Sequence, residues 1–161
     1  CEIFIVATGG QLLTIRGMVE VLGLLILSVL LASTFNMFLV LFIHSLNAFS
    51  TLSTIIGTVI GFLCGVYVPF GVLPGFAQNL IMYFPISHTT VLLREAFMQN
   101  SIQTVFANAS DAQVEDYKIN FAIVYEMNGK LLASTTSLLV IVITTIVLAA
   151  LSIIIFKKKN K

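Results

Sequence analysis

Charged side chains are almost absent from three long stretches of this sequence, and this absence constrains the fold more than any other feature. Of the 161 residues, 58% are hydrophobic and only 9% are charged. A soluble domain carries about 25% charged residues, so this composition could not build a surface that faces water. A lipid bilayer can cover such a surface, and about 20 consecutive apolar residues form a helix that crosses it. The sequence therefore predicts an all-α polytopic membrane protein.

The apolar stretches place the expected membrane helices. We expect transmembrane helices over residues 18–44, 53–68 and 132–156. Residues 1–8 are also apolar, and we interpret them as the tail of a helix whose beginning lies outside this sequence. In this interpretation residues 1–161 are part of one transmembrane domain of a longer protein.

The basic residues predict the orientation. Lysines cluster in the segment 157–161, and basic residues beside membrane helices stay on the cytoplasmic side. We therefore expect a cytoplasmic C-terminal tail in a multi-pass protein of the inner or plasma membrane. The polar segment 99–131, in which acidic residues outnumber lysines, should then be an extracellular loop. The net charge of +1 gives the chain no general attraction to nucleic acid.

Prolines interrupt the apolar segment between the second and third predicted helices. Pro69, Pro74 and Pro85 are the only prolines in the chain, and they divide this segment into short pieces. Each proline removes a backbone donor and disfavours helix at the residue before it. Short apolar pieces suit a re-entrant segment better than a full crossing. We therefore expect residues 69–98 to form a re-entrant helical hairpin on the external side.

Ionisable residues in the same segment also argue against a full crossing. At mid-membrane a residue such as Arg94 or Glu95 costs about 2.5–3.5 kcal/mol, whereas each Leu, Val or Phe returns about 0.3–0.6 kcal/mol. A full crossing stays open as an alternative. It would reverse the orientation of the first two helices and place Arg16 in the cytoplasm, the side on which basic residues beside membrane helices stay. His88 and Glu95, seven residues apart, share a helix face and could form a proton relay or a simple hydrogen-bonded pair.

Small residues recur at every fourth position along the second predicted helix. They are Ser53, Gly57, Gly61 and Gly65. Such a stripe lets another helix backbone approach closely. We expect helix packing there, although glycine is also common in membrane helices for other reasons.

The first predicted helix carries a polar face. Ser33, Asn36 and His44 recur there at helical spacing. Because an unpaired polar group facing lipid is costly, this face should point toward other helices or a cavity. We interpret Ser33 and Asn36 as candidate residues of a translocation path.

Enzyme motifs are missing from the sequence. It contains no phosphate-binding loop of the form G-x-x-x-x-G-K-[ST]. It also lacks a cluster of His, Cys and acidic residues at metal-ligand spacing, and a G-x-S-x-G nucleophile elbow. The two cysteines, Cys1 and Cys64, give no disulfide framework. We therefore expect no catalytic, cofactor-binding or metal-binding residues in this chain.

Four segments resemble the permease subunits of type-2 ATP-binding-cassette exporters, especially the bacterial multidrug members. They are SLNAFSTLSTIIGTVIGFL at 45–63, GVYVPFGVLP at 65–74, FPISHTTVLLREAF at 84–97, and the final helix that ends in lysines. The second is similar to the family's Gly-x-x-x-Pro-x-x-x-Leu-Pro signature before its external hairpin. The third is similar to the family's Pro-x-(Ser/Thr)-(His/Tyr)…Arg segment. The resemblance covers residues 20–100 best.

This resemblance implies the C-terminal half of a six-helix permease that pairs with a second, identical or different, permease subunit. It also implies a cytoplasmic ATPase, fused or separate, which would bind ATP and Mg. Residues 45–52, as the connection between the first two helices, would contact that ATPase through Asn47 and Phe49. The implied function is the ATP-driven export of a lipophilic or amphipathic substrate by alternating access. The remaining alternatives are a non-transporting membrane scaffold and a secondary transporter, which usually needs ionisable residues inside its helices.

Overall fold

The computed structural model describes residues 14–43, 45–127 and 130–159, and over these ranges the chain is mainly helical. The helices are α2 (Ile15–Val40), α3 (Leu46–Leu63), the short 3₁₀ helix η1 (Phe70–Val72), α4 (Gly75–Tyr83), α5 (Pro85–Val105), α6 (Asp111–Asn120) and α7 (Ser134–Lys159). The strands β1 (Glu126–Met127) and β2 (Lys130–Leu131) form one antiparallel pair. The predicted helical fold class is confirmed.

Three of these helices, α2, α3 and α7, are long and apolar enough to cross a membrane. At 1.5 Å per residue the 26 residues of α2 and of α7 extend about 39 Å, and the 18 residues of α3 about 27 Å. The hydrocarbon core of a bilayer is about 30 Å thick. The chain therefore has the construction of a helical membrane protein, with these three helices in the places of the three predicted spans.

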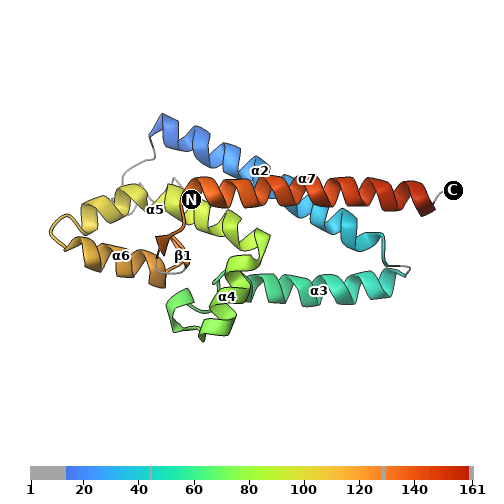
Figure 1. Ribbon diagram of the computed structural model, residues 1–161, viewed down its shortest axis with the longest axis horizontal. Helices are drawn as coiled ribbons and strands as arrows, with labels where there is room; N and C mark the ends of the chain where they lie inside the picture. The colour runs from blue at the N-terminus through green and yellow to red at the C-terminus, as the bar shows by residue number, and fades with distance from the viewer. Residues whose placement is uncertain (1–13, 44, 128–129, 160–161) are drawn as a thin grey trace.

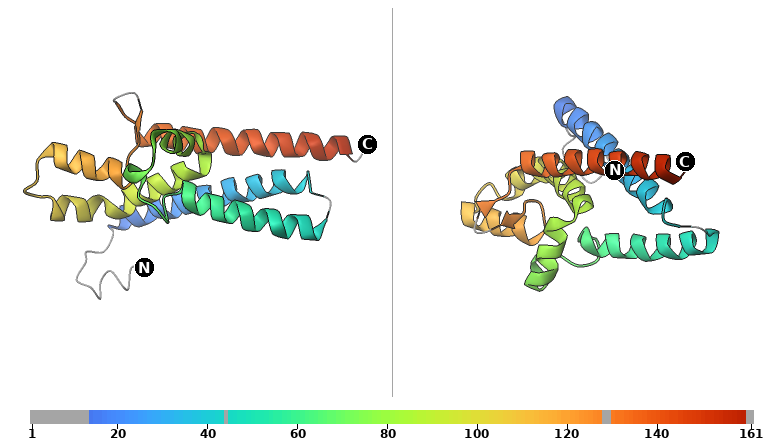
Figure 2. Two further views of the ribbon diagram at one scale, coloured as in Figure 1. Left: turned by 90° about the horizontal axis from the view of Figure 1, so that it is seen from below. Right: turned by 45° about the vertical axis from the view of Figure 1, so that its right-hand side comes forward.

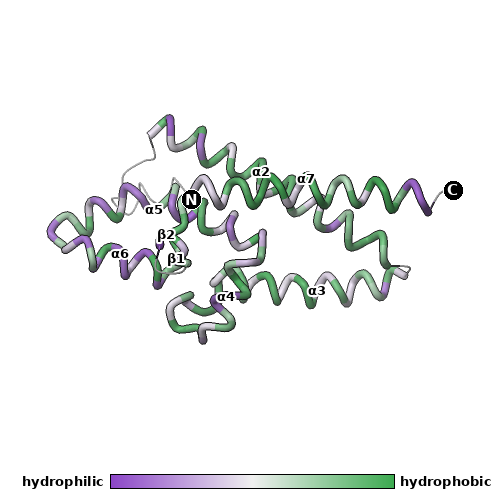
Figure 3. Tube along the Cα trace, in the orientation of Figure 1, coloured by the Kyte–Doolittle hydropathy of each residue, from purple (hydrophilic) through white to green (hydrophobic). Residues whose placement is uncertain are grey.

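The helices divide the molecule into two ends. Figure 1 shows α2 and α7 side by side, with α3 running back from the end of α2. The remaining elements, α4, α5, α6 and the β pair, gather at the end where α2 and α7 begin (Figures 1 and 2). We call this part of the chain, residues 66–133, the lobe. Its second half is rich in hydrophilic residues, whereas α2, α3 and α7 are mostly hydrophobic (Figure 3).

Helix α5 connects the two hydrophobic cores. The first core joins α5 to α2 and α7, and its buried members are Leu24, Leu31, Leu92 and Ile141. The second lies inside the lobe, and its buried members are Phe70, Ile81, Val91, Ala122 and Tyr125. Neighbouring residues of α5 therefore serve different cores. Helix α5 is therefore the main element through which the lobe packs against α2 and α7.

Helix α3 begins earlier and ends earlier than predicted. Residues 45–52 form the first two turns of α3 instead of a connection, because the Ser45 hydroxyl accepts a hydrogen bond from the Ala48 amide (3.2 Å) and caps the helix. The helix ends at Leu63 and not at 68, because Gly65 adopts a left-handed conformation (φ +63°). The backbone hydrogen bonds there close a Schellman motif, which terminates the helix.

Each proline of the interrupted segment begins a helix. Pro69 precedes η1, Pro74 precedes α4, and Pro85 is the first residue of α5. Proline suits these positions because the first helical residues have no intrahelical acceptor for their amides. Residues 69–98 therefore contain η1, the nine-residue α4 and most of α5.

The predicted loop 99–131 is largely regular structure. Helix α5 continues to Val105, and α6 and the β pair follow it. Ser110 and Gln113 form a capping box that starts α6, since each side chain bonds the other residue's backbone amide. The last predicted helix, 132–156, matches α7, which continues through the lysines at 157–159. The predicted helix tail at 1–8 lies outside the described residues.

Candidate functional site

Arg94 of α5 holds the ends of two other helices. Its Nη2 donates hydrogen bonds to the carbonyls of Cys64 (3.0 Å) and Gly65 (2.9 Å), at the end of α3. Its Nη1 donates to the carbonyl of Phe121 (2.9 Å), at the end of α6. Helix α6 also closes with a Schellman motif, in which Ala122 has φ +49°. Carbonyls at helix C-termini lack intrahelical donors and carry partial negative charge, so the guanidinium satisfies both ends at once.

His88 of α5 is buried between the lobe and α7, with 2% of its surface exposed. Its Nε2 lies 2.9 Å from the carbonyl oxygen of Met82, and its Nδ1 lies 3.0 Å from the hydroxyl oxygen of Ser137. Because a carbonyl only accepts, Nε2 carries the proton, and Nδ1 accepts from Ser137. Burial lowers the pKa of His88, which lies outside the three candidate spans, although the Met82 contact opposes this. The imidazole is therefore neutral at neutral pH.

Tyr125 lies against this histidine. The two rings meet edge to face, with their centroids 5.5 Å apart. Burial raises the pKa of Tyr125 to about 12, so the phenol also stays neutral. The neighbouring Ser87 is fully buried, and its hydroxyl oxygen lies 2.6 Å from the carbonyl oxygen of Ile81 and 2.7 Å from that of Phe84, so these two acceptors share its single proton. The buried side chains of His88, Tyr125 and Ser87 are thus uncharged, and those of His88 and Ser87 are hydrogen-bonded.

Glu95 contacts the first residue of α7. The Ser134 hydroxyl donates to Glu95 Oε2 at 2.7 Å, and a carboxylate near a helix N-terminus is stabilised by the helix dipole. His88 and Glu95 share a helix face as predicted, but each bonds to α7 and not to the other. The predicted direct pair is therefore wrong. The two residues instead fix α5 against the first turn of α7.

A cavity of about 230 Å³ lies between α2 and α3. Its lining includes Asn36, Ser53 and Gly57, so the structure brings one residue of the predicted translocation path together with two of the small-residue stripe. The Asn36 side chain donates to the backbone carbonyl of Ala32 at 2.9 Å. Ser33 is exposed and does not line this cavity.

The small-residue stripe does not continue as one surface. Ser53, Gly57 and Gly61 lie on α3, whereas Gly65 is past its end. A Cβ at Gly57 would meet nothing within 4 Å, and one at Gly61 would come within 2.5 Å of the Tyr67 ring. At Gly57, therefore, no other helix backbone of the described residues packs against the stripe.

Helix α3 has an exposed polar face that was not among the predicted features. Its residues are Asn47, Ser50, Thr51, Thr54 and Thr58. Each threonine hydroxyl donates to the carbonyl four residues earlier, at 3.0 Å. The opposite side of the helix, toward α2, carries apolar residues that are half-buried. The signal was present in the sequence, since positions 47, 51, 54 and 58 follow the 4-3-4 spacing of one helix face.

The two residues expected to contact an ATPase lie on the first turns of α3. Asn47 is exposed, and its carbonyl accepts from Thr51. Phe49 lines the cavity between α2 and α3. The first turns of α3 lie at the end of the molecule opposite the lobe, near the end of α7 (Figure 1).

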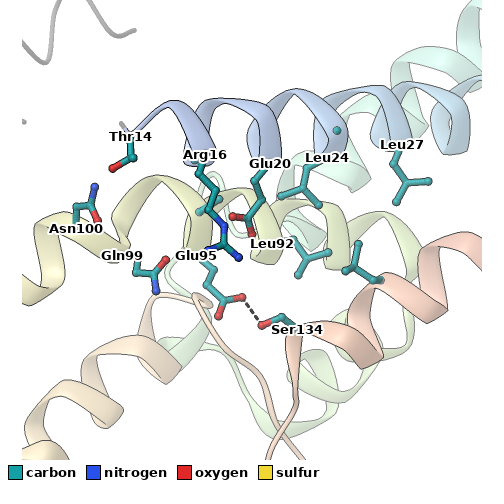
Figure 4. A pocket seen from close by; sticks show the side chains of 14 residues that line it. Thr14, Arg16, Glu20, Leu24, Leu27, Leu92, Glu95, Gln99, Asn100 and Ser134 are labelled. Carbon is teal, nitrogen blue, oxygen red and sulfur yellow. Dashed lines mark hydrogen bonds between the residues drawn. The ribbon is translucent and has the colours of Figure 1, made fainter. Parts of the chain in front are cut away.

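A larger cavity, of about 720 Å³, lies where α2 and α7 begin. Arg16 and Glu20 of α2 and Glu95 of α5 converge on it (Figure 4). The sequence alone does not bring these three residues together, because their convergence depends on how α2 packs against α5.

Comparisons with protein-family models, with curated proteins and with solved structures give no match for this chain. Within the described ranges, no group of three or more His, Cys, Asp and Glu residues could hold a metal ion.

Proposed function

We propose that this chain is part of the membrane-spanning permease of a type-2 ATP-binding-cassette exporter. It would move a lipophilic or amphipathic substrate out of the cell by alternating access. The motif resemblance at 65–74 and 84–97 supports this proposal, as do the three candidate spans. ATP and Mg would bind to a partner ATPase, and a second permease subunit would complete the transporter.

The exposed polar face of α3 is the observation that carries the proposal. A membrane helix that contacts only lipid needs no hydroxyl face, and polar side chains in membrane helices mostly face other helices or water-filled cavities. Here Thr54 and Thr58 point away from α2, whose side of α3 is apolar. A second subunit opposite this face would enclose a polar route between the two permeases.

The lobe would form the external gate of this route. Helix α3 ends at the lobe and α7 begins there, and Arg94 and Glu95 bond to these two helix ends. We propose that residues 69–98 enter the outer leaflet as a re-entrant hairpin, with the C-terminus in the cytoplasm. Asn47 and Phe49, at the other end of α3, would then lie on the side of the ATPase.

Ion-coupled transport is a weaker candidate. Such transporters use ionisable residues within their spans. In α2 the charged residues, Arg16 and Glu20, lie in the first two turns, and in α7 they are the terminal lysines. Helix α3 has none. ATP hydrolysis therefore supplies the energy in our proposal.

The double substitution of Thr54→Leu and Thr58→Leu tests the polar face. In the full-length protein we expect ATP-dependent efflux of a fluorescent lipophilic substrate to fall at least about tenfold at an unchanged membrane level. The matched control replaces Ile55 and Val59, on the neighbouring exposed apolar side of α3, with Leu and should transport normally. Normal efflux in the threonine variant would contradict the proposed route.

A second experiment tests the energy source. Tagged full-length protein is purified in a mild detergent, and the co-purifying chains are identified by mass spectrometry. We expect a stoichiometric ATPase that contains a phosphate-binding loop, or the same domain fused to this chain. Its absence in several detergents would contradict the exporter proposal and favour the scaffold.

A further inference from the structure

The cavity where α2 and α7 begin is built for an amphipathic molecule. Its volume of about 720 Å³ falls in the range of small-molecule sites, about 300–1,000 Å³. One part of its lining is apolar and comes from three helices: Leu24, Leu27, Leu92 and Leu138. The other part is polar: Thr14, Arg16, Glu20, Glu95, Gln99, Asn100 and Ser134. A ligand in this cavity would meet both kinds of surface.

The charged side chains of the cavity form no ion pair among the described residues. In Figure 4 the side chains of Arg16, Glu20 and Glu95 point into the same cavity, and the only hydrogen bond drawn joins Glu95 to Ser134. That bond uses one oxygen of Glu95 and leaves the other free to accept. Glu20 makes no hydrogen bond to another described residue. The cavity thus offers one cationic donor and two anionic acceptors to a ligand.

This charge set selects among amphiphiles. A purely anionic head group would be repelled by the two carboxylates, and a purely cationic one, although attracted to them, would leave Arg16 without a partner. A head group with both a phosphate and a primary ammonium matches all three residues. Arg16 can bind phosphate through two parallel N–H groups, and the carboxylates can accept from the ammonium.

The position of the cavity favours a membrane lipid as the source of this head group. It lies at the first turns of α2 and α7, two helices that can span a bilayer. The leucines continue from the polar residues along the direction of these spans, where acyl chains would lie. An aqueous zwitterion would gain nothing from this apolar part.

We propose that this cavity binds a phospholipid whose head group carries a phosphate and a primary amine, in the leaflet at which α2 and α7 begin. Arg16 binds the phosphate, Glu20 and Glu95 bind the ammonium, and the acyl chains contact the leucines. This binding does not depend on the exporter proposal, since it requires only that the helices lie in a membrane.

Native mass spectrometry of the purified full-length protein, titrated with three phospholipids, tests the assignment. We expect phosphatidylethanolamine to be retained about three- to tenfold more than phosphatidylglycerol, which lacks the ammonium. Phosphatidylcholine should fall between them, because its quaternary ammonium has no N–H to donate. Equal retention of the three lipids would overturn the proposal.

Substitutions assign the head group to the residues. Glu20→Gln and Glu95→Gln should each reduce the preference for phosphatidylethanolamine over phosphatidylglycerol. Arg16→Gln should reduce the retention of both lipids. Glu115→Gln, on the exposed side of α6, is the control and should change neither. Glu95 also contacts α7, so its substitution affects packing as well as charge. If the Glu95→Gln protein is unstable, Glu20→Gln is the deciding test. An unchanged preference in Glu20→Gln would overturn the proposal.

Soluble glycerophosphoethanolamine distinguishes a lipid from a free zwitterion. It carries the same charges without acyl chains, so we expect it to displace the lipid only at far higher concentration. Displacement at a concentration similar to that of the lipid would overturn the assignment to a membrane lipid.

Discussion

Arg94 joins three helices through one side chain. Its planar guanidinium reaches the ends of α3 and α6 from α5, so three helices meet at a single group. Lysine carries the same charge but only one ammonium on a flexible chain, and it cannot reproduce a forked contact. The need for this residue is therefore geometric as well as electrostatic.

We predict that Arg94→Lys lowers the free energy of unfolding by about 1–3 kcal/mol, because at least one helix end loses its donor. Unfolding of the detergent-solubilised protein, followed by heat or a denaturing detergent, measures the change. Glu115→Gln alters a charge of the same lobe on an exposed site and should leave the stability within about 0.5 kcal/mol of wild type. Equal stability of the Arg94→Lys variant and wild type would show that the lobe does not need the guanidinium's simultaneous contact with the ends of α3 and α6.

His88 should make the stability depend on pH. Its pKa is lowered in the folded protein, whereas the unfolded imidazole titrates near its usual value of about 6.5. Below about pH 6.5 the unfolded state therefore binds a proton that the folded state does not. The stability that this group contributes is complete above pH 6.5 and is lost as the pH falls toward the folded pKa.

The corresponding measurement compares unfolding midpoints of wild type and His88→Gln between pH 7.5 and 5.5. We expect the wild-type midpoint to fall with acid more steeply than that of the variant. The variant should also be less stable at pH 7.5, because Ser137 and Met82 lose a buried partner. Parallel pH profiles would contradict a titration of this histidine.

At the scale of elements, Gly71 sets how closely η1 packs on α6. A Cβ at this position would overlap the side chain of Asn120 and approach its backbone. We predict that Gly71→Ala destabilises the protein by about 1–3 kcal/mol, as overpacking does in other cores. Gly75→Ala is the matched control, because a Cβ there meets nothing within 4 Å. Thermal unfolding in detergent compares the two, and equal midpoints would contradict the close packing.

The three apolar helices and the proline breaks were predictable, because each depends on local composition. The early start of α3 and the whole of α6 were missed, although Ser45 and the Ser110–Gln113 capping box are local signals. A polar composition was interpreted as loop in both places. In such polar segments, a capping residue is better evidence for a helix than polar composition is for a loop.

The contacts of the site were less predictable. His88, Arg94 and Glu95 stand out in the sequence, but their partners do not, because all of them except Met82 lie 27 to 49 residues away in the chain. These pairings exist because α5 packs between the rest of the lobe and α7. That packing depends on the burial of Val91 and Leu92 in two cores, and no local pattern specifies it.

At the scale of the whole molecule, the order of helix ends bears on topology. Helix α3 ends and α7 begins at the lobe, while the turn between α2 and α3 lies at the same end as the terminal lysines of α7 (Figures 1 and 2). If α3 and α7 each cross the membrane and the segment between them does not, as we propose, an even number of crossings separates the α2–α3 turn from the C-terminus. A full crossing by residues 66–98 would make that number odd.

Cysteine labelling in intact cells distinguishes these two topologies. Single cysteines replace Ser45, Glu115 or Lys158 in a full-length cysteine-free background, and a membrane-impermeant thiol reagent is added before or after permeabilisation. We expect Ser45→Cys and Lys158→Cys to react only after permeabilisation, because both lie at the lysine end, where basic residues stay cytoplasmic. Glu115→Cys, on α6 in the lobe, should react in intact cells. Labelling of positions 45 and 158 from opposite sides would mean that the segment between α3 and the end of α5 crosses the membrane.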